Sequence, residues 1–219
     1  MEIFDISRAL SDETAPWPGD TAFHFELKWK MADGATVNVG AITMGVHNGT
    51  HADATLHFDE GGDPIERMPL DAYVGDAVVV DLTKLFARTG DQLDRARQIG
   101  IADLEAVAAS LEQAPRLLLK TGIWKDSSIF PDWIPVIAPD VPAWLRERRV
   151  RLLGLDLPSV DPIEAKKLAN HHALAAAGIA ILESLNLNEV EAGVYHFSAL
   201  PLKITGGDAG PVRAILWRD

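Results

Sequence analysis

The apolar pattern of this chain changes about a third of the way along, and that change sets the fold class. Residues 23–29 (FHFELKW) alternate with a period of two, and residues 37–44 carry β-branched side chains at intervals, which is typical of strands. From residue 77 onward, short apolar runs alternate with segments at helical spacing. A β-rich front followed by this alternation predicts an α/β (α+β) fold, with a mixed central sheet or barrel-like core flanked by helices.

The second part of the chain gives element bounds. We predict strands over 77–82, 116–119, 152–157, 179–185 and 212–217, and helices over 101–113, 143–149 and 161–178. The last helix has the clearest start, because Asp161 is a favourable N-cap, Pro162 suits the first helical position and Glu164 completes a capping box. No repeat or linker divides the chain, so we expect residues 1–219 to form a single domain.

Composition and charge narrow the function classes. The 219 residues include no cysteine, which excludes disulfides and every metal site built on sulfur. The net charge of −12 argues against nucleic acid and anionic membrane as partners, since both require a cationic surface. The first residues lack the basic start and apolar stretch of a signal peptide, and no apolar run approaches ~18 residues, so we predict a cytoplasmic location.

Three of the seven histidines, His47, His51 and His57, fall within eleven residues together with Asp53. Imidazole and carboxylate are the ligands that a cysteine-free metal site must use. A helix would spread these four side chains around its axis, whereas a straight strand would place His47 and His51 roughly 13 Å apart. A bend at Asn48-Gly49, where positive φ is tolerated, would let the ligands converge. The alternative is a polar loop with scattered surface histidines.

Further ligands would have to come from elsewhere in the chain. His171 and His172 lie midway along the last predicted helix, and Glu183 lies in the strand after it. Adjacent helix residues diverge by about 100°, so only one of the two histidines can face a shared site. Either histidine could equally be a structural or solvated residue of that helix.

The run from His47 to Asp53, followed by His57, resembles the HxGTHxDxPxH signature of the metal-dependent cyclase/formamidase superfamily. Within it, the chain is most similar to the bacterial kynurenine formamidase (arylformamidase) group. The resemblance covers nearly the whole chain, and its other matching segments are Asp5-Ile6-Ser7, Pro16-Trp17-Pro18-Gly19-Asp20, residues 154–162, His171 with Glu183, residues 200–203 and residues 210–214. It implies a cyclase-family fold.

The resemblance also implies a metal centre with two zinc ions per subunit, with manganese as the alternative metal. His47 and His51 would bind the first zinc, and Asp53 would bridge it to the second. His171 would bind the second zinc, and Glu183 would bridge both. His172, one position further along, matches no ligand position.

The implied activity is hydrolysis of a small-molecule aryl formamide by a homodimer. N-formyl-L-kynurenine and water would give L-kynurenine and formate, a step in tryptophan degradation. His57 would be the catalytic proton donor and acceptor, and Trp17 would line the substrate pocket. For Trp124, Phe130 and Trp133 we expect packing of loops against the core.

Two alternatives remain at this point. One is a related amidase that opens a cyclic amide such as isatin, and the other is a non-catalytic metal-binding protein, which would have no use for a free His57 beside its ligands. Thr55 stands where the family usually has proline, and we expect it to loosen the segment carrying His57 and to add a hydroxyl near the site. Gly206-Gly207-Asp208 is predicted to form a turn, because a strand follows it.

Overall fold

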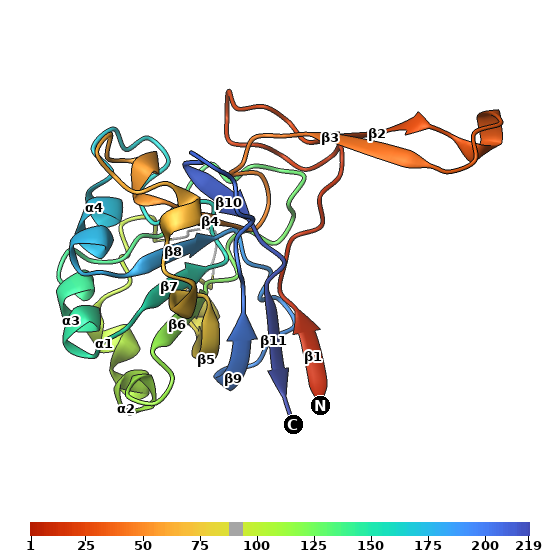
Figure 1. Ribbon diagram of the computed structural model, residues 1–219. Helices are drawn as coiled ribbons and strands as arrows, with labels where there is room; N and C mark the ends of the chain where they lie inside the picture. Colours follow the sequence, from red (N-terminus) through yellow and green to blue (C-terminus); the bar gives the residue numbers. More distant parts are fainter. Residues whose placement is uncertain (88–93) are drawn as a thin grey trace.

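A nine-stranded mixed sheet forms the centre of the molecule in the computed structural model, which describes residues 1–87 and 94–219 (Figure 1). The strand order is β1-β11-β9-β5-β6-β7-β8-β4-β10. The pairs β5–β6, β6–β7 and β7–β8 are parallel, and the remaining pairs are antiparallel. The sheet curls into a half-barrel, which confirms the predicted mixed sheet flanked by helices.

The strands of this sheet are β1 Glu2–Asp5, β4 His51–Asp53, β5 Val74–Asp81, β6 Arg116–Lys120, β7 Leu152–Leu155, β8 Ala180–Glu183, β9 Gly193–Ser198, β10 Ala209–Pro211 and β11 Ile215–Arg218. The α-helices are α1 Ile101–Leu104, α2 Ala108–Leu111, α3 Val141–Glu147 and α4 Ala169–Ala176. Short 3-10 helices are η1 Met31–Asp33, η2 Thr55–His57, η3 Ile65–Arg67, η4 Leu70–Ala72, η5 Thr83–Phe86 and η6 Glu105–Val107. In the described part of the chain, no helix has the length and apolarity needed to traverse a lipid bilayer.

Both faces of the sheet are buried, which explains the continuous apolar runs of its central strands. In β5, Val78 and Val80 pack on the face that the α-helices cover, while Ala77 and Val79 pack into the other face (Figure 1). Each fully buried aliphatic side chain of this size contributes about 1.5–3 kcal/mol. The centre of the sheet is therefore a rigid support for side chains at its ends.

The predicted start of the last helix is wrong. Residues 161–168 are irregular, and α4 begins only at Ala169, after Leu168 in a left-handed conformation with φ of 44°. Asp161 does cap this helix, because its buried carboxylate accepts the backbone N–H groups of Asn170 and His171 at 2.9–3.1 Å. The side chain thus reaches across a loop to a later helix. The predicted helix over 101–113 is also divided, into α1, η6 and α2.

A two-stranded hairpin extends from the body of the molecule as an arm (Figure 1). It consists of β2 His24–Trp29 and β3 Val39–Thr43, where the sequence predicted strands. Phe25 pairs with Ile42 across the hairpin, and both are solvent-exposed, by 48% and 61%. These apolar side chains are not covered by other parts of the described chain. A two-stranded hairpin without such cover is only marginally stable in water.

Candidate metal centre

The candidate ligands meet at the end of the sheet where β4 lies between β8 and β10. His51 and Asp53 share one face of β4, because side chains two residues apart in a strand point the same way. Glu183 is the residue of β8 directly opposite His51. The Nε2 atom of His51 lies 3.4 Å from Asp53 Oδ1 and 3.5 Å from Glu183 Oε2. His51 and Asp53 therefore lie in a short strand.

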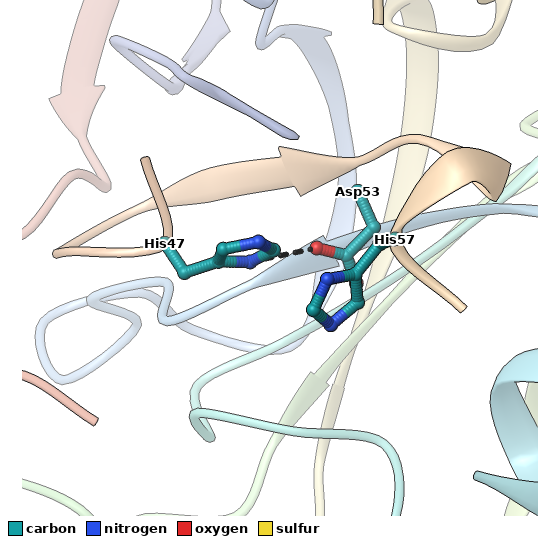
Figure 2. A group of neighbouring side chains, drawn as sticks. All are labelled: His47, Asp53 and His57. Atoms are coloured by element: carbon teal, nitrogen blue, oxygen red, sulfur yellow. Dashed lines mark ion pairs between the residues drawn. The ribbon is translucent and has the colours of Figure 1, made fainter. Parts of the chain in front are cut away.

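The chain bends before β4, where the sequence predicted a bend. Gly49 adopts a positive φ of 66°, while the buried Asn48 instead donates its side-chain amide to the Thr21 carbonyl at 2.7 Å. This turn brings His47 back over β4, with Nδ1 at 3.3 Å from Asp53 Oδ1 (Figure 2). The four side chains of the motif are therefore close together.

Helix α4 contributes one of its two histidines. His171 Nε2 lies 3.4 Å from Asp53 Oδ2 and 3.5 Å from Glu183 Oε1. His172 is exposed on α4 and is absent from the described cavity wall. The positions agree with the expectation that only one of the pair can face the site.

The two carboxylates divide their oxygens between two sets of histidines. Asp53 directs Oδ1 to His47 and His51 and Oδ2 to His171. Glu183 directs Oε2 to His51 and Oε1 to His171. A carboxylate placed in this way can bridge two cations.

The donor set fits a metal centre on two independent observations. His51 Nε2 and both carboxylate oxygens of Asp53 are buried without a hydrogen-bond partner in the protein, although such atoms are nearly always paired. Their separations of 3.3–3.5 Å are long for hydrogen bonds. They match the edges of about 3.4 Å expected for a tetrahedron with bonds of about 2.0–2.1 Å to a metal.

A second contact orients the ring of each candidate histidine ligand. The ring nitrogen that points away from the centre lies within hydrogen-bond distance of an acceptor. The pairs are His51 Nδ1 with the Gly49 carbonyl at 3.0 Å, His47 Nε2 with Asp208 Oδ2 at 3.0 Å, and His171 Nδ1 with Asp161 Oδ2 at 2.7 Å. Such contacts are typical of metal-binding histidines, because they fix the tautomer and the direction of the free nitrogen.

Sequence reasoning missed the roles of Asp161 and Asp208. The predicted turn at Asp208 leads into β10, whose Ala209 pairs with Asp53 in β4. That pairing carries Asp208 to the site, and no local spacing in the sequence could have indicated it. Asp161 was predicted only as an N-cap, whereas its carboxylate also accepts from the His171 imidazole.

The electrostatics of the centre show that its buried carboxylates are stabilised by neighbouring positive charge. Burial alone would lower the pKa of His51, but the adjacent carboxylates of Asp53 and Glu183 outweigh it and raise the pKa to about 10. His171 behaves likewise, because its hydrogen bond with Asp161 and the nearby carboxylates of Asp53 and Glu183 raise its pKa to about 12. Burial would raise the pKa of Asp53, yet the surrounding histidines hold it well below the usual value. The buried carboxylates thus require positive charge beside them.

His57 lies next to His47 and Asp53 (Figure 2). Its ring centroid is 4.1 Å from that of His47, and its Nδ1 is 3.5 Å from Asp208 Oδ2. Its side chain is 30% exposed, and partial burial lowers its pKa, which favours the neutral imidazole. His57 is also near enough to His47 and Asp53 to share a metal with them. Position alone therefore permits proton transfer or ligation.

Thr55 differs from the expectation. Its hydroxyl accepts the backbone N–H of Asp63 at 2.7 Å and donates to the Asp63 carbonyl at 3.3 Å. Thr55 is not part of the cavity wall, so its hydroxyl does not face the cavity. The two bonds tie η2 to the following loop instead of loosening the segment that carries His57.

A cavity of about 400 Å³ opens over the candidate ligands, which is enough for a small aromatic molecule. Trp17, Phe130 and Trp124 line it as an aromatic wall, with centroid distances of 5.2 Å and 5.9 Å between successive rings. We expected Trp17 here and packing against the core for Phe130 and Trp124. Trp124 does both, since it is buried in the helix-covered core and also lines the cavity, whereas Phe130 lies outside that core cluster. Trp133 packs against Phe86 beside the helix-covered core, as predicted.

Sequence comparisons match this chain over nearly its whole length. The family model "Cyclase", described as "Putative cyclase", matches residues 4–162. The kynurenine formamidase of Geobacillus thermodenitrificans is 42% identical over 212 residues, which are 97% of this chain and 95% of that protein. The kynurenine formamidase of Bacillus cereus is 41% identical over 215 residues, covering 98% and 97% of the two chains.

Solved structures share the fold. A structure described as a potential metal-dependent hydrolase with cyclase activity superposes with a TM-score of 0.79 and 25% identity, covering 98% of this chain and 96% of that one. Isatin hydrolase A of Labrenzia aggregata gives a TM-score of 0.79 at 24% identity, covering 98% and 93%. The second likeness extends to the fold alone.

Proposed function

Since this chain belongs to the cyclase family, we propose that it is a metal-dependent hydrolase that converts N-formyl-L-kynurenine and water to L-kynurenine and formate. Its full-length similarity to kynurenine formamidases supports this activity. The observation that carries the proposal is one cavity in which an aromatic wall faces a donor set suited to metal ions. The wall can hold the aryl ring while the donor set lies at the formamide.

We propose that the centre holds two zinc ions, with manganese as the alternative. His47 and His51 would hold one ion and His171 the other, while Asp53 and Glu183 would bridge them. The division of the carboxylate oxygens between the two histidine sets supports this assignment. Elemental analysis of protein reconstituted with zinc tests it, and a stoichiometry that stays below one ion per chain would contradict two sites.

Bound metal would supply an activated water near neutral pH and polarise the formyl carbonyl. The chain's own residues would do the rest. Trp17 and Phe130 would hold the aryl ring beside the centre. His57, as a neutral imidazole, would accept a proton from the attacking water and pass it to the departing aniline nitrogen. Asp208 would keep His47 oriented through its bond to Nε2.

The test compares kcat/KM of the zinc-loaded protein on N-formyl-L-kynurenine, formanilide and isatin. We expect the first to be the best substrate, because binding of its amino-acid part can be used in the transition state. A much higher value for isatin would transfer the assignment to the cyclic-amide amidase. Zinc binding without turnover of any of the three would favour the non-catalytic alternative.

We also propose that the protein is a homodimer in which the β2–β3 arm of one copy packs on the other. The arm exposes Phe25, Trp29 and Ile42, and its two lysines and two acids cancel, so that the net charge of −12 lies on the rest of the chain. Because the arm has exposed apolar side chains and no net charge, it adds no like-charge repulsion when two acidic copies associate. Light scattering of the wild type and of a variant with Phe25→Ser and Ile42→Ser tests this, with a monomeric wild type as the contradicting result. The cytoplasmic location stays a prediction.

A further inference from the structure

The segment before the arm presents an aromatic ring and a carboxylate together at the cavity. The Asp20 N–H donates to the Trp17 carbonyl at 2.9 Å, with Pro18 and Gly19 between them. Gly19 has a positive φ of 93°, which together with proline before it is typical of a type II turn. Such a turn brings its first and last Cα atoms within about 7 Å. Both Trp17 and Asp20 line the cavity.

The Asp20 carboxylate is held in place by its surroundings. Its Oδ1 accepts the N–H of Thr21 at 2.6 Å, and its Oδ2 packs against Gly45 so closely that a Cβ there would displace the carboxylate. The Thr21 carbonyl in turn accepts the Gly45 N–H at 3.0 Å and the Asn48 amide at 2.7 Å. These bonds fasten the turn to the loop that carries His47, so the exposed Asp20 carboxylate projects from a backbone segment that is attached to the metal centre.

The described cavity wall contains carboxylates but no lysine or arginine. Glu183 faces the candidate histidine ligands, and Asp208 is bonded to His47. Asp20 is the lining carboxylate that adjoins the aromatic wall instead. The wall therefore offers a carboxylate to a ligand cation beside the aromatic rings, while the described lining offers no lysine or arginine to a ligand carboxylate.

We propose that Asp20 binds the α-ammonium group of the substrate and that the cavity does not require the substrate's carboxylate. This inference rests on the proposed function, because it takes the aryl ring to lie at Trp17. In kynurenine a ketone, a methylene and the α-carbon separate the ring from the ammonium group, a span that the Trp17–Asp20 turn can cover. The substrate class is then an aryl formamide with an aliphatic amine on its ortho side chain, with or without a carboxylate.

Four substrates separate the contributions of the two charged groups. They are N-formyl-L-kynurenine, its decarboxylated analogue N-formylkynuramine, its analogue lacking the amine, and formanilide. We expect the first two to have kcat/KM values within a few-fold of each other in the wild type. Asp20→Asn should lower both about tenfold, since hydrogen bonds to charged groups are the stronger ones, and should leave the other two unchanged.

Glu13→Gln is the matched control, because Glu13 is exposed in the same segment and lies outside the cavity wall. It should change none of the four values. An equal loss on all four substrates in Asp20→Asn would make Asp20 structural and overturn the proposal. The proposal would also be overturned if Asp20→Asn lowered kcat/KM on none of the substrates. It would equally be overturned if the wild type had a far lower kcat/KM on the decarboxylated analogue than on the complete substrate.

A failure of the proposed function is distinguishable. If the zinc-loaded wild type hydrolyses none of the four formamides, the activity is wrong, and calorimetric titration with kynuramine still tests Asp20. Tenfold weaker binding to a folded Asp20→Asn protein would support the amine site. Equal binding to both proteins, or no binding to either, would refute it.

Discussion

The cavity has a floor and a rim that differ in burial and in attachment. The floor consists of His51, Asp53, His171 and Glu183, whose side chains are 1–4% exposed. The rim consists of His47, His57 and Asp208, whose side chains are 18–47% exposed. Strand register and a helix start fix the floor, whereas turns and a 3-10 helix carry the rim. The difference places the most deeply buried charges in the floor, whereas the side chains of the rim are open to solvent.

The largest expected effect comes from the floor. Asp53→Asn removes the negative charge that both histidine sets share, so we expect metal to be lost at both positions and activity to fall to background. Metal per chain and kcat, measured on one preparation, check this. Asp12→Asn, an exposed change outside the cavity wall, is the control. Full metal content in Asp53→Asn would mean that the floor does not need its central carboxylate.

At the rim, His57→Ala should leave metal content and fold intact while kcat falls by about 10²–10⁴. KM should change little if the imidazole acts mainly in the transition state. His172→Ala, on the exposed side of α4, should change neither quantity. Loss of metal from His57→Ala would make this residue a ligand and would remove the division between floor and rim.

The residues of the floor and of the rim also differ in whether they can be predicted from the sequence. The four motif side chains and the bend at Gly49 follow from local spacing and from the conformational freedom of glycine. Glu183 could be proposed only as a distant candidate, because apolar alternation does not reveal that β8 pairs with β4. Asp208 could not be found at all, since only the β4–β10 pairing brings it to His47.

The helix containing His171 shows a different limit. Asp161 has the chemistry of an N-cap, and the prediction that it caps a helix is confirmed. The assumption that a cap precedes its helix directly is wrong here, because a loop of irregular residues lies between Asp161 and Ala169. The carboxylate satisfies the same orphan N–H groups from a different point in the chain.

The two carboxylates behind the histidines allow a graded comparison. Asp208→Asn should weaken zinc binding about 10–100-fold, the usual effect of removing an orienting partner, with little change in melting temperature. Asp161→Ala should weaken binding similarly and also lower the melting temperature, because it removes the side-chain oxygens that cap α4. Chelator competition and thermal unfolding measure the two quantities. Equal melting temperatures for the two variants would contradict the structural role given to Asp161.

The smallest expected effect concerns Thr55. Thr55→Ala removes two hydrogen bonds to Asp63 at an exposed position, so we expect a loss of about 1 kcal/mol in the free energy of unfolding. Activity should fall less than tenfold, with metal content unchanged, because the hydroxyl does not reach the cavity. Denaturant unfolding and kcat check this. A loss as large as that of His57→Ala would show that the rim depends on this tie.

The double duty of Asp161 has a thermodynamic consequence. One carboxylate both begins α4 and orients the His171 imidazole, so the helix cannot open at its start without disturbing the ring. A metal held by that ring then acts as a ligand of the native state, and an ion at a hundred times its dissociation constant would stabilise that state by about 2.7 kcal/mol. Amide hydrogens at the start of α4 would exchange more slowly as the concentration of free zinc rises. Their exchange rate would therefore report how much of the metal site is filled.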